Sequence, residues 1–141
     1  MIQRQLQSTL GIKVETALLD WSSYLKRWSS GDFQLIIGRW FSWFPDPIYT
    51  LQHVKHAQDG INASRFENHR FIDLLNRSDE ADNPLERNNH LREAEELVMH
   101  ELPIIPLVHL AHNYAKHRDI VGEVFSSVGV MELKWLEKAR R

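Results

Sequence analysis

The most informative stretch of this chain reads Gly31-Asp-Phe-Gln-Leu-Ile-Ile-Gly-Arg-Trp40-Phe-Ser-Trp43-Phe44-Pro45-Asp46-Pro47. Its apolar first half, residues 33–37, predicts a buried strand, and the aromatic residues follow directly where that strand would end. Rings that gather at a strand exit are suited to line a ligand crevice. The alternative is that they are ordinary core residues, and the sequence alone leaves both interpretations open.

The residues before this stretch predict a strand–helix–strand unit. Residues 12–19 suggest a strand, and Asp20 follows as a helix cap. The next strand covers residues 33–39, and in such a unit the two strands are expected to be parallel neighbours. Between them, apolar residues at helical spacing predict a helix that carries Trp21, Tyr24, Leu25 and Trp28. Residues 2–10 resemble the second half of an amphipathic helix, which ends at Gly11.

The rest of the chain alternates helix signals with short apolar runs. Asn68 and Asn83 are good helix caps, and Pro84 suits the first turn of the helix after Asn83. The expected elements are a short helix over 47–52, an exposed loop over 53–65, helices after Asn68 and over 84–101, and strands over 104–110 and 128–135.

Composition and charge exclude several classes of protein. The chain has 141 residues, which fits one domain, and 43% of them are hydrophobic, as in ordinary globular proteins. The net charge is −2 without a basic stripe, so we expect no nucleic-acid partner. No apolar run approaches the length of a membrane span. Cysteine is absent, which excludes thiol catalysis and disulfides.

Catalytic and metal-binding patterns are missing from the sequence. There is no nucleophile elbow and no phosphate-binding glycine loop. His53 and His56 could share a helical face, but no third ligand stands at a zinc spacing. Asp46 lacks an identifiable acid–base partner, and its place before proline favours a turn. We therefore expect a binding protein rather than an enzyme, without a cofactor.

The tryptophans are the best candidates for ligand contact. Trp21, Trp40 and Trp43 could form flat walls for a small or peptidic ligand, whereas Trp28 and Trp135 are expected in the core. For Trp21 a core position is an equal alternative, because Tyr24 and its neighbours continue the same helix face.

The motifs together resemble the bacterial extracellular solute-binding proteins of family 5, the peptide, oligopeptide and nickel binding proteins of ABC importers. The resemblance covers essentially the whole chain and matches the C-terminal part of the second lobe. It is carried by residues 5–14, Asp20-Trp21, Tyr24-Leu25, Gly31-Asp32-Phe33, the Trp40 to Pro47 segment, Asn62 ahead of Phe66, Phe71 with Asp73-Leu-Leu75, Ala94-Glu95, and Pro103-Ile-Ile-Pro106.

The resemblance implies an α/β fold, as part of a periplasmic-binding-protein type II lobe with a mixed sheet and flanking helices. Residues 1–141 would be a lobe fragment without the N-terminal lobe. The implied function is capture of oligopeptides for import, with ABC permease subunits as partners and a periplasmic location. The expected ligand-binding residues are Trp21, Trp40, Phe41, Trp43, Phe44 and Asp46.

One departure from the family bears on the ligand. Many peptide-binding members carry an aspartate, which holds the α-amino group of the peptide, where this chain has Trp43. A buried ammonium needs such a partner, so Trp43 would instead stack on a ring or fill the subsite.

Two alternatives to peptide capture remain open. One is a metal or metal-chelate binder of the same family that uses histidines such as His53 or His56. The other is a truncated remnant without a transport role. The start of the chain shows no signal peptide, which would be consistent with a cytoplasmic truncated product.

Overall fold

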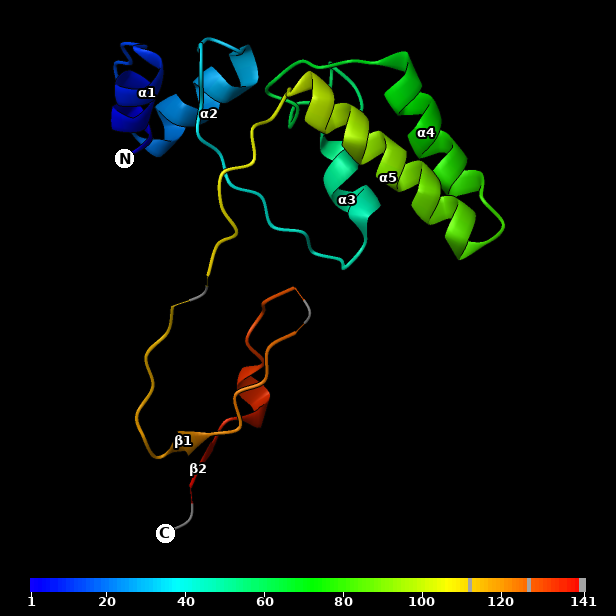
Figure 1. Cartoon of the computed structure of the whole chain (residues 1–141). Coiled ribbons are helices and arrows are strands. Elements are labelled where there is room, and N and C mark those ends of the chain that lie inside the picture. Colours follow the sequence, from blue (N-terminus) through cyan, green and yellow to red (C-terminus); the bar gives the residue numbers. More distant parts are fainter. Residues whose placement is uncertain (112, 127, 140–141) are drawn as a thin grey trace. The chain divides into compact units, whose positions relative to one another are not determined.

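The computed structural model describes residues 1–111, 113–126 and 128–139, and Figure 1 shows the course of the chain. The chain divides into two units, Met1–Ile36 and Ile37–Arg141.

The first unit consists of two short helices with the predicted caps. Helix α1, Ile2–Leu10, ends at Gly11, whose φ of 68° is left-handed and therefore suits glycine. Helix α2, Trp21–Ser30, begins at Asp20, whose carboxylate accepts a hydrogen bond from the Ser23 N–H. Hydrogen bonds from the side chains of Ser22 and Ser23 hold the pKa of the Asp20 carboxyl well below its usual range. Both predicted helices are confirmed.

The second unit is built on a helical hairpin. Helix α4, His69–Glu80, and helix α5, Pro84–Glu101, pack side by side (Figure 1). Asn68 accepts hydrogen bonds from the backbone N–H groups at the start of α4, and Asn83 does the same for α5. The Asn83 side chain also donates to the Glu86 carboxylate at 3.1 Å. These caps confirm both helix starts predicted from the sequence.

Two shorter elements complete the core of this unit. Helix α3, Pro47–Leu51, runs into a 3-10 turn, Gln52–Val54. Phe71 and Leu75 of α4 are completely buried, and Phe66 packs at the edge of the cluster. The buried apolar residues are Leu51, Val54, Phe71, Leu74, Leu75, Leu91, Ala94 and Val98.

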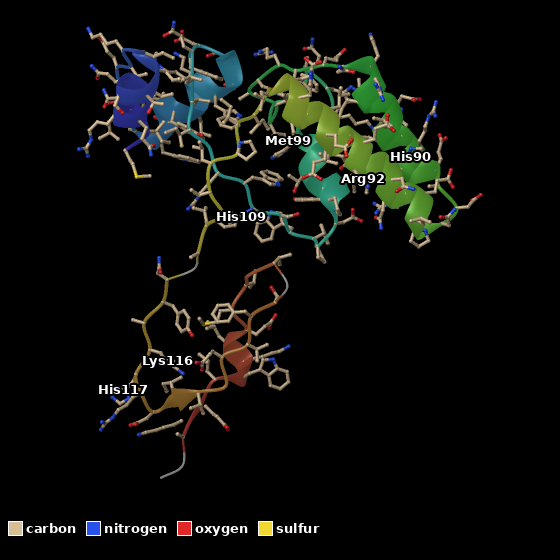
Figure 2. All side chains as sticks on the ribbon, viewed as in Figure 1. His90, Arg92, Met99, His109, Lys116 and His117 are labelled. Carbon is tan, nitrogen blue, oxygen red and sulfur yellow. The ribbon has the colours of Figure 1, made fainter. Side chains whose placement is uncertain are left out.

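The C-terminal part of the chain forms a small hairpin. Strand β1, Ile120–Val121, pairs antiparallel with strand β2, Glu137–Lys138, and a 3-10 turn, Leu133–Trp135, precedes β2. The Tyr114 and Phe125 rings lie 5.4 Å apart between centroids. The Lys116 ammonium pairs with the Glu123 carboxylate, which lowers the pKa of Glu123; Figure 2 labels Lys116.

Substitution of Gly122 by alanine should open this hairpin. Gly122 has a φ of 86°, and a Cβ there would lie 2.1 Å from the Trp135 carbonyl oxygen. We expect Gly122→Ala to expose the Ala139 N–H, which donates to the Asp119 carbonyl at 2.7 Å. Hydrogen exchange at Ala139 measures this effect. Gly60→Ala is the control, because a Cβ at Gly60 meets nothing within 4 Å. Equal protection in both variants would contradict the prediction.

The strand predictions are largely wrong. Among the described residues, 12–19, 33–39 and 104–110 form no ladder, and the only sheet has the order β1–β2. The expected parallel pair is therefore not present in the described structure. Residues 128–135 hold a bridge at Met131 and a 3-10 turn instead of a strand. A strand requires a neighbouring backbone as well as β-forming residues, and here apolar residues such as Leu35 and Ile37 remain 70% exposed.

The predicted exposed loop over 53–65 is also partly wrong. Val54 and Asn62 are only 3% and 4% exposed, so the segment has a buried residue near each end.

Candidate functional site

Trp40 and Phe44 of the informative stretch lie against α3 and the turn that follows it. The ring centroids of Trp40 and Tyr49 are 5.7 Å apart in a stacked arrangement, and Phe44 meets Tyr49 edge-on at 5.5 Å. The His53 imidazole contacts the Trp40 indole. We call Trp40, Phe44, Tyr49 and His53 the aromatic cluster. The contacts run in series from His53 through Trp40 and Tyr49 to Phe44, and stacked and edge-on pairs are favourable arrangements of aromatic rings.

Burial within this cluster affects the chemistry of His53. Desolvation disfavours the charged imidazolium and lowers the pKa of His53 below its ordinary value. A neutral imidazole can stack on a ring or exchange hydrogen bonds with a ligand, since one nitrogen donates and the other accepts.

One face of the aromatic cluster borders an open hollow of about 430 Å³. Trp40, Tyr49 and Ile61 supply apolar walls, and polar side chains form the remainder. Lys55 is engaged elsewhere, because its ammonium donates to the Asn76 side chain at 2.8 Å. Flat apolar walls with a few polar groups are typical of small-ligand sites. The lining residues are Trp40, Tyr49, Gln52, His53, Lys55, His56, Asp59 and Ile61.

Asp46 performs a structural task beside the aromatic cluster. Its carboxylate caps α3 by accepting from the Ile48 N–H at 3.1 Å. Nη2 of Arg87, on α5, lies 3.0 Å from both carboxylate oxygens. Partial desolvation raises the pKa of Asp46, but the hydrogen bonds from Arg87 and Ile48 outweigh it and leave the pKa lowered. The turn and cap interpretation of Asp46 agrees with this geometry.

The lowered pKa of Asp46 predicts an acid-sensitive contribution to stability. A depressed carboxyl pKa stabilises the fold above the unfolded-state pKa, about 4 for aspartate, and this stabilisation is lost as the pH falls through the folded-state value. We therefore expect Asp46→Asn to destabilise the chain at neutral pH and to have a shrinking effect below about pH 4. Urea unfolding of both proteins across this range measures it. A penalty that does not change with pH would contradict the prediction.

The other predicted site residues are less closely associated with the aromatic cluster. The Arg39 guanidinium lies 5.2 Å from the centre of the Phe41 ring. Trp43 is 66% exposed, and no ring contact is recorded for it within the described part of the chain. Trp21 lies in the first unit, where it stacks on Tyr24 at 5.3 Å and is 72% exposed. The core alternative for Trp21 is therefore not supported.

Sequence reasoning missed Tyr49 and Arg87, and it considered His53 only as a metal ligand. Tyr49 and His53 are spaced by four along consecutive helical turns, which is a signal for one shared face. Arg87 carries no local signal, because it meets Asp46 across 41 residues of sequence.

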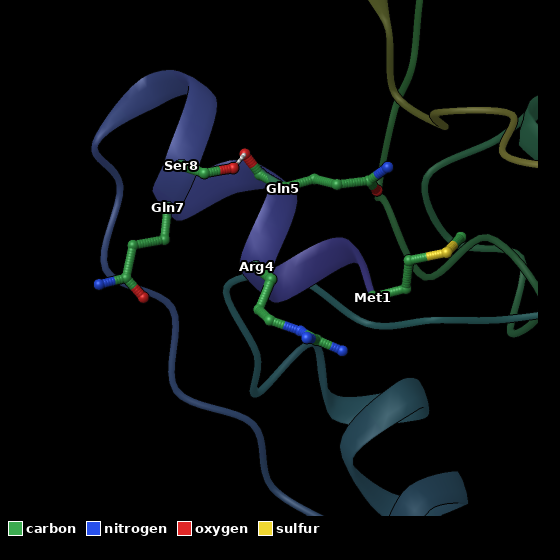
Figure 3. Close-up of a pocket in the computed structure, with 5 residues that line it drawn as sticks. All are labelled: Met1, Arg4, Gln5, Gln7 and Ser8. Carbon is green, nitrogen blue, oxygen red and sulfur yellow. Dashed lines mark hydrogen bonds between the residues drawn. The ribbon is translucent and has the colours of Figure 1, made fainter.

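A second open hollow, of about 530 Å³, lies on α1. Figure 3 shows its five lining residues and the hydrogen bond of 3.3 Å from the Ser8 hydroxyl to the Gln5 carbonyl. All of them come from one exposed helix and its start, so this hollow has no opposing wall. The lining residues are Met1, Arg4, Gln5, Gln7 and Ser8.

The described residues contain neither a cluster of metal-ligating side chains nor a helix that could span a membrane. In the described ranges, no group of three or more His, Asp or Glu side chains could hold a metal ion. The metal alternative built on His53 and His56 therefore gains no support. None of the described helices combines the length and hydropathy that crossing a bilayer requires.

Comparison with known proteins relates the first part of this chain to one family of binding proteins. Residues 1–62 match the family described as bacterial extracellular solute-binding proteins, family 5 Middle. The resemblance indicated by the sequence motifs is thereby confirmed: the chain is related to the solute-binding proteins of family 5.

Individual relatives extend this match over nearly the whole chain. The dipeptide-binding protein DppE of Bacillus subtilis (strain 168) is 26% identical over 137 residues, which cover 97% of this chain and 25% of DppE. The oligopeptide-binding protein OppA of the same organism is 27% identical over 128 residues, 91% of this chain and 24% of OppA. The chain thus spans about a quarter of the length of these curated relatives.

Solved structures show that the fold is shared. The pheromone receptor PrgZ aligns with 99% of this chain and 27% of its own, with a TM-score of 0.80 and 22% identity. The unliganded open form of the periplasmic murein tripeptide-binding protein MppA aligns with 72% of this chain and 20% of its own, with a TM-score of 0.69 and 22% identity. The predicted fold class, part of an α/β lobe of this type of binding protein, is confirmed.

Proposed function

We propose that this chain forms part of the ligand-binding lobe of an ABC importer's substrate-binding protein, and that the ligand is an oligopeptide. The observation that carries the proposal is the aromatic cluster, whose rings border a hollow on the surface of the second unit. Relatives named for dipeptide and oligopeptide binding match the chain along almost its whole length, which supports a peptide as the ligand.

Binding is the proposed event, without bond chemistry. Trp40 and Phe44 would provide apolar contact and stacking, and Phe41 and Trp43 would add wall area. Asp46 would support the site without contacting the ligand, because its carboxylate already accepts hydrogen bonds from Arg87. The proposed partners are a peptide and the permease subunits of an importer, in the periplasm.

The proposal is tested by the mass, N-terminus and bound peptides of the native polypeptide in its source cells. An antibody against this chain, followed by intact-mass spectrometry, gives the mass and N-terminus of the native product and shows whether peptides accompany it. We expect a product several times larger than 16.6 kDa, in the exported fraction and with bound peptide. A cytoplasmic product of 16.6 kDa without peptide would favour a remnant and would overturn the transport proposal.

The chain of 141 residues alone should bind peptides weakly or not at all. In this family type the ligand is buried between two lobes, whereas the rings here face an open hollow, with Trp40 itself 39% exposed. Calorimetric titration with a panel of dipeptides to pentapeptides measures the affinity. Micromolar binding by the folded monomer would contradict this prediction, and Trp40→Ala is the control for binding at the aromatic cluster.

A further inference from the structure

The start of α3 is tied to α5 by one side-chain pair. Both Asp46 oxygens lie 3.0 Å from Nη2 of Arg87, and the Asp46 and Arg87 side chains are 39% and 29% exposed. Charge-assisted hydrogen bonds of this kind are stronger than bonds between neutral groups, and partial burial protects them from screening by salt. The pair is therefore better placed to hold a geometry than the more exposed Arg92–Glu96 pair of α5.

Residues of the aromatic cluster lie close to Asp46 in the sequence. Phe44 lies two positions before Asp46, and Tyr49 lies three positions after it. Ile48 and Leu51 attach α3 to the apolar core, but the segment that leads into α3 has no buried residue from 40 to 45. Its rings contact Tyr49 and His53 at the surface. The position of this segment thus depends on where Asp46 is held.

We propose that Arg87 is a positioning residue for the ligand-binding wall: by holding the Asp46 carboxylate, it fixes the segment 40–45 so that Trp40 and Phe44 stay on Tyr49 and His53. This inference rests on the proposed function in one respect, that the aromatic cluster is the ligand wall. It also assigns Asp46 a role different from ligand contact. An incoming ammonium would have to compete with Arg87 and the Ile48 N–H for the same two oxygens.

The test uses proton NMR of the His53 ring in the whole chain, without ligand. The Trp40 indole lies against His53 and shifts its ring-proton resonance, and loss of the histidine signal in His53→Asn assigns that resonance. The Trp40→Ala variant gives the chemical shift of the His53 resonance when the indole is absent. In Arg87→Met, which keeps the aliphatic stem but loses the donors, we expect the resonance to move more than half of the way to the Trp40→Ala position. Arg87→Lys should restore part of the difference.

Two further variants make the outcome decisive. Asp46→Asn retains an oxygen for the Ile48 N–H but loses the carboxylate charge, so it should produce the same displacement and decides the matter if Arg87→Met does not fold. Arg92→Met is the matched control on α5, since Arg92 is 73% exposed and pairs only along its own helix with Glu96; Figure 2 labels Arg92. An unmoved His53 resonance in folded Arg87→Met or Asp46→Asn would overturn the inference, as would an equal shift in Arg92→Met. Neither result depends on peptide binding, so the proposed function is tested separately.

Discussion

Replacement of Phe71 by alanine is expected to lower the free energy of unfolding of the helical unit by about 3–5 kcal/mol. Phe71, in the first turn of α4, is completely buried in the core of this unit, and its ring meets the Phe66 ring edge-on at 5.8 Å between centroids. Alanine would remove the buried ring and leave a cavity that the two helices cannot close without losing their other contacts.

The size of this effect follows from the small core of the unit. Eight apolar residues are buried in the described structure, and Phe71 is the largest of them. Because single domains are stable by only about 5–15 kcal/mol, the loss would remove a large part of the total. Urea unfolding followed by far-UV circular dichroism measures it, since helices dominate that signal.

A matched variant on the same hairpin separates core packing from helix propensity. Leu85 lies in the first turn of α5 and is 72% exposed, so Leu85→Ala should change the stability by less than about 0.5 kcal/mol. Comparable losses in the two variants, or a Phe71→Ala protein as stable as the parent, would show that the helices do not pack around this ring.

The helices were predictable because their end signals are local. Asp20, Asn68 and Asn83 each cap a helix start with their own side chain, and Gly11 ends α1 in the left-handed region. Such signals operate within four residues, so they do not depend on the rest of the fold.

The strands were not predictable in the same way, because their partners are distant. Residues 33–37 and 104–110 have the composition of buried strands, yet Leu35 and Val108 remain more than two-thirds exposed, at 70% and 73%. The composition of a segment indicates that its side chains are suited to burial. Forming a strand also requires hydrogen bonds to a neighbouring backbone at the correct distance. The aromatic cluster falls between these cases. Trp40 and Phe44 were identified as candidate wall residues, but Arg87 lies 41 positions from its partner and could not be found from spacing.

Asn62→Ala is expected to cost about 2–4 kcal/mol and to deform the hollow beside the aromatic cluster. The Asn62 side chain is buried, at 4% residue exposure, and its amide donates to the His56 carbonyl at 3.0 Å and to the Phe66 carbonyl at 2.9 Å. Its oxygen accepts from the Ser64 hydroxyl at 2.7 Å. Alanine would remove these three hydrogen bonds, and one such bond contributes about 0.5–1.5 kcal/mol net.

The same side chain explains how a segment without regular structure keeps a fixed shape. By joining residue 56 to residue 66, Asn62 closes the loop that contributes His56, Asp59 and Ile61 to the hollow. Asn62→Asp separates size from hydrogen bonding: it keeps the acceptor for Ser64 but turns the two donated bonds into repulsion between oxygens, so it should destabilise at least as much as alanine at neutral pH. Asn89→Ala, on the exposed face of α5, is the control and should be near neutral. Unfolding in urea gives the energies, and hydrogen exchange at the Phe66 and Asn62 amides reports the loop. If Asn62→Asp were as stable as the parent chain, the two donated hydrogen bonds would not be what holds this loop, and the shape of the hollow would have to depend on Val54 and the packing of Phe66 instead.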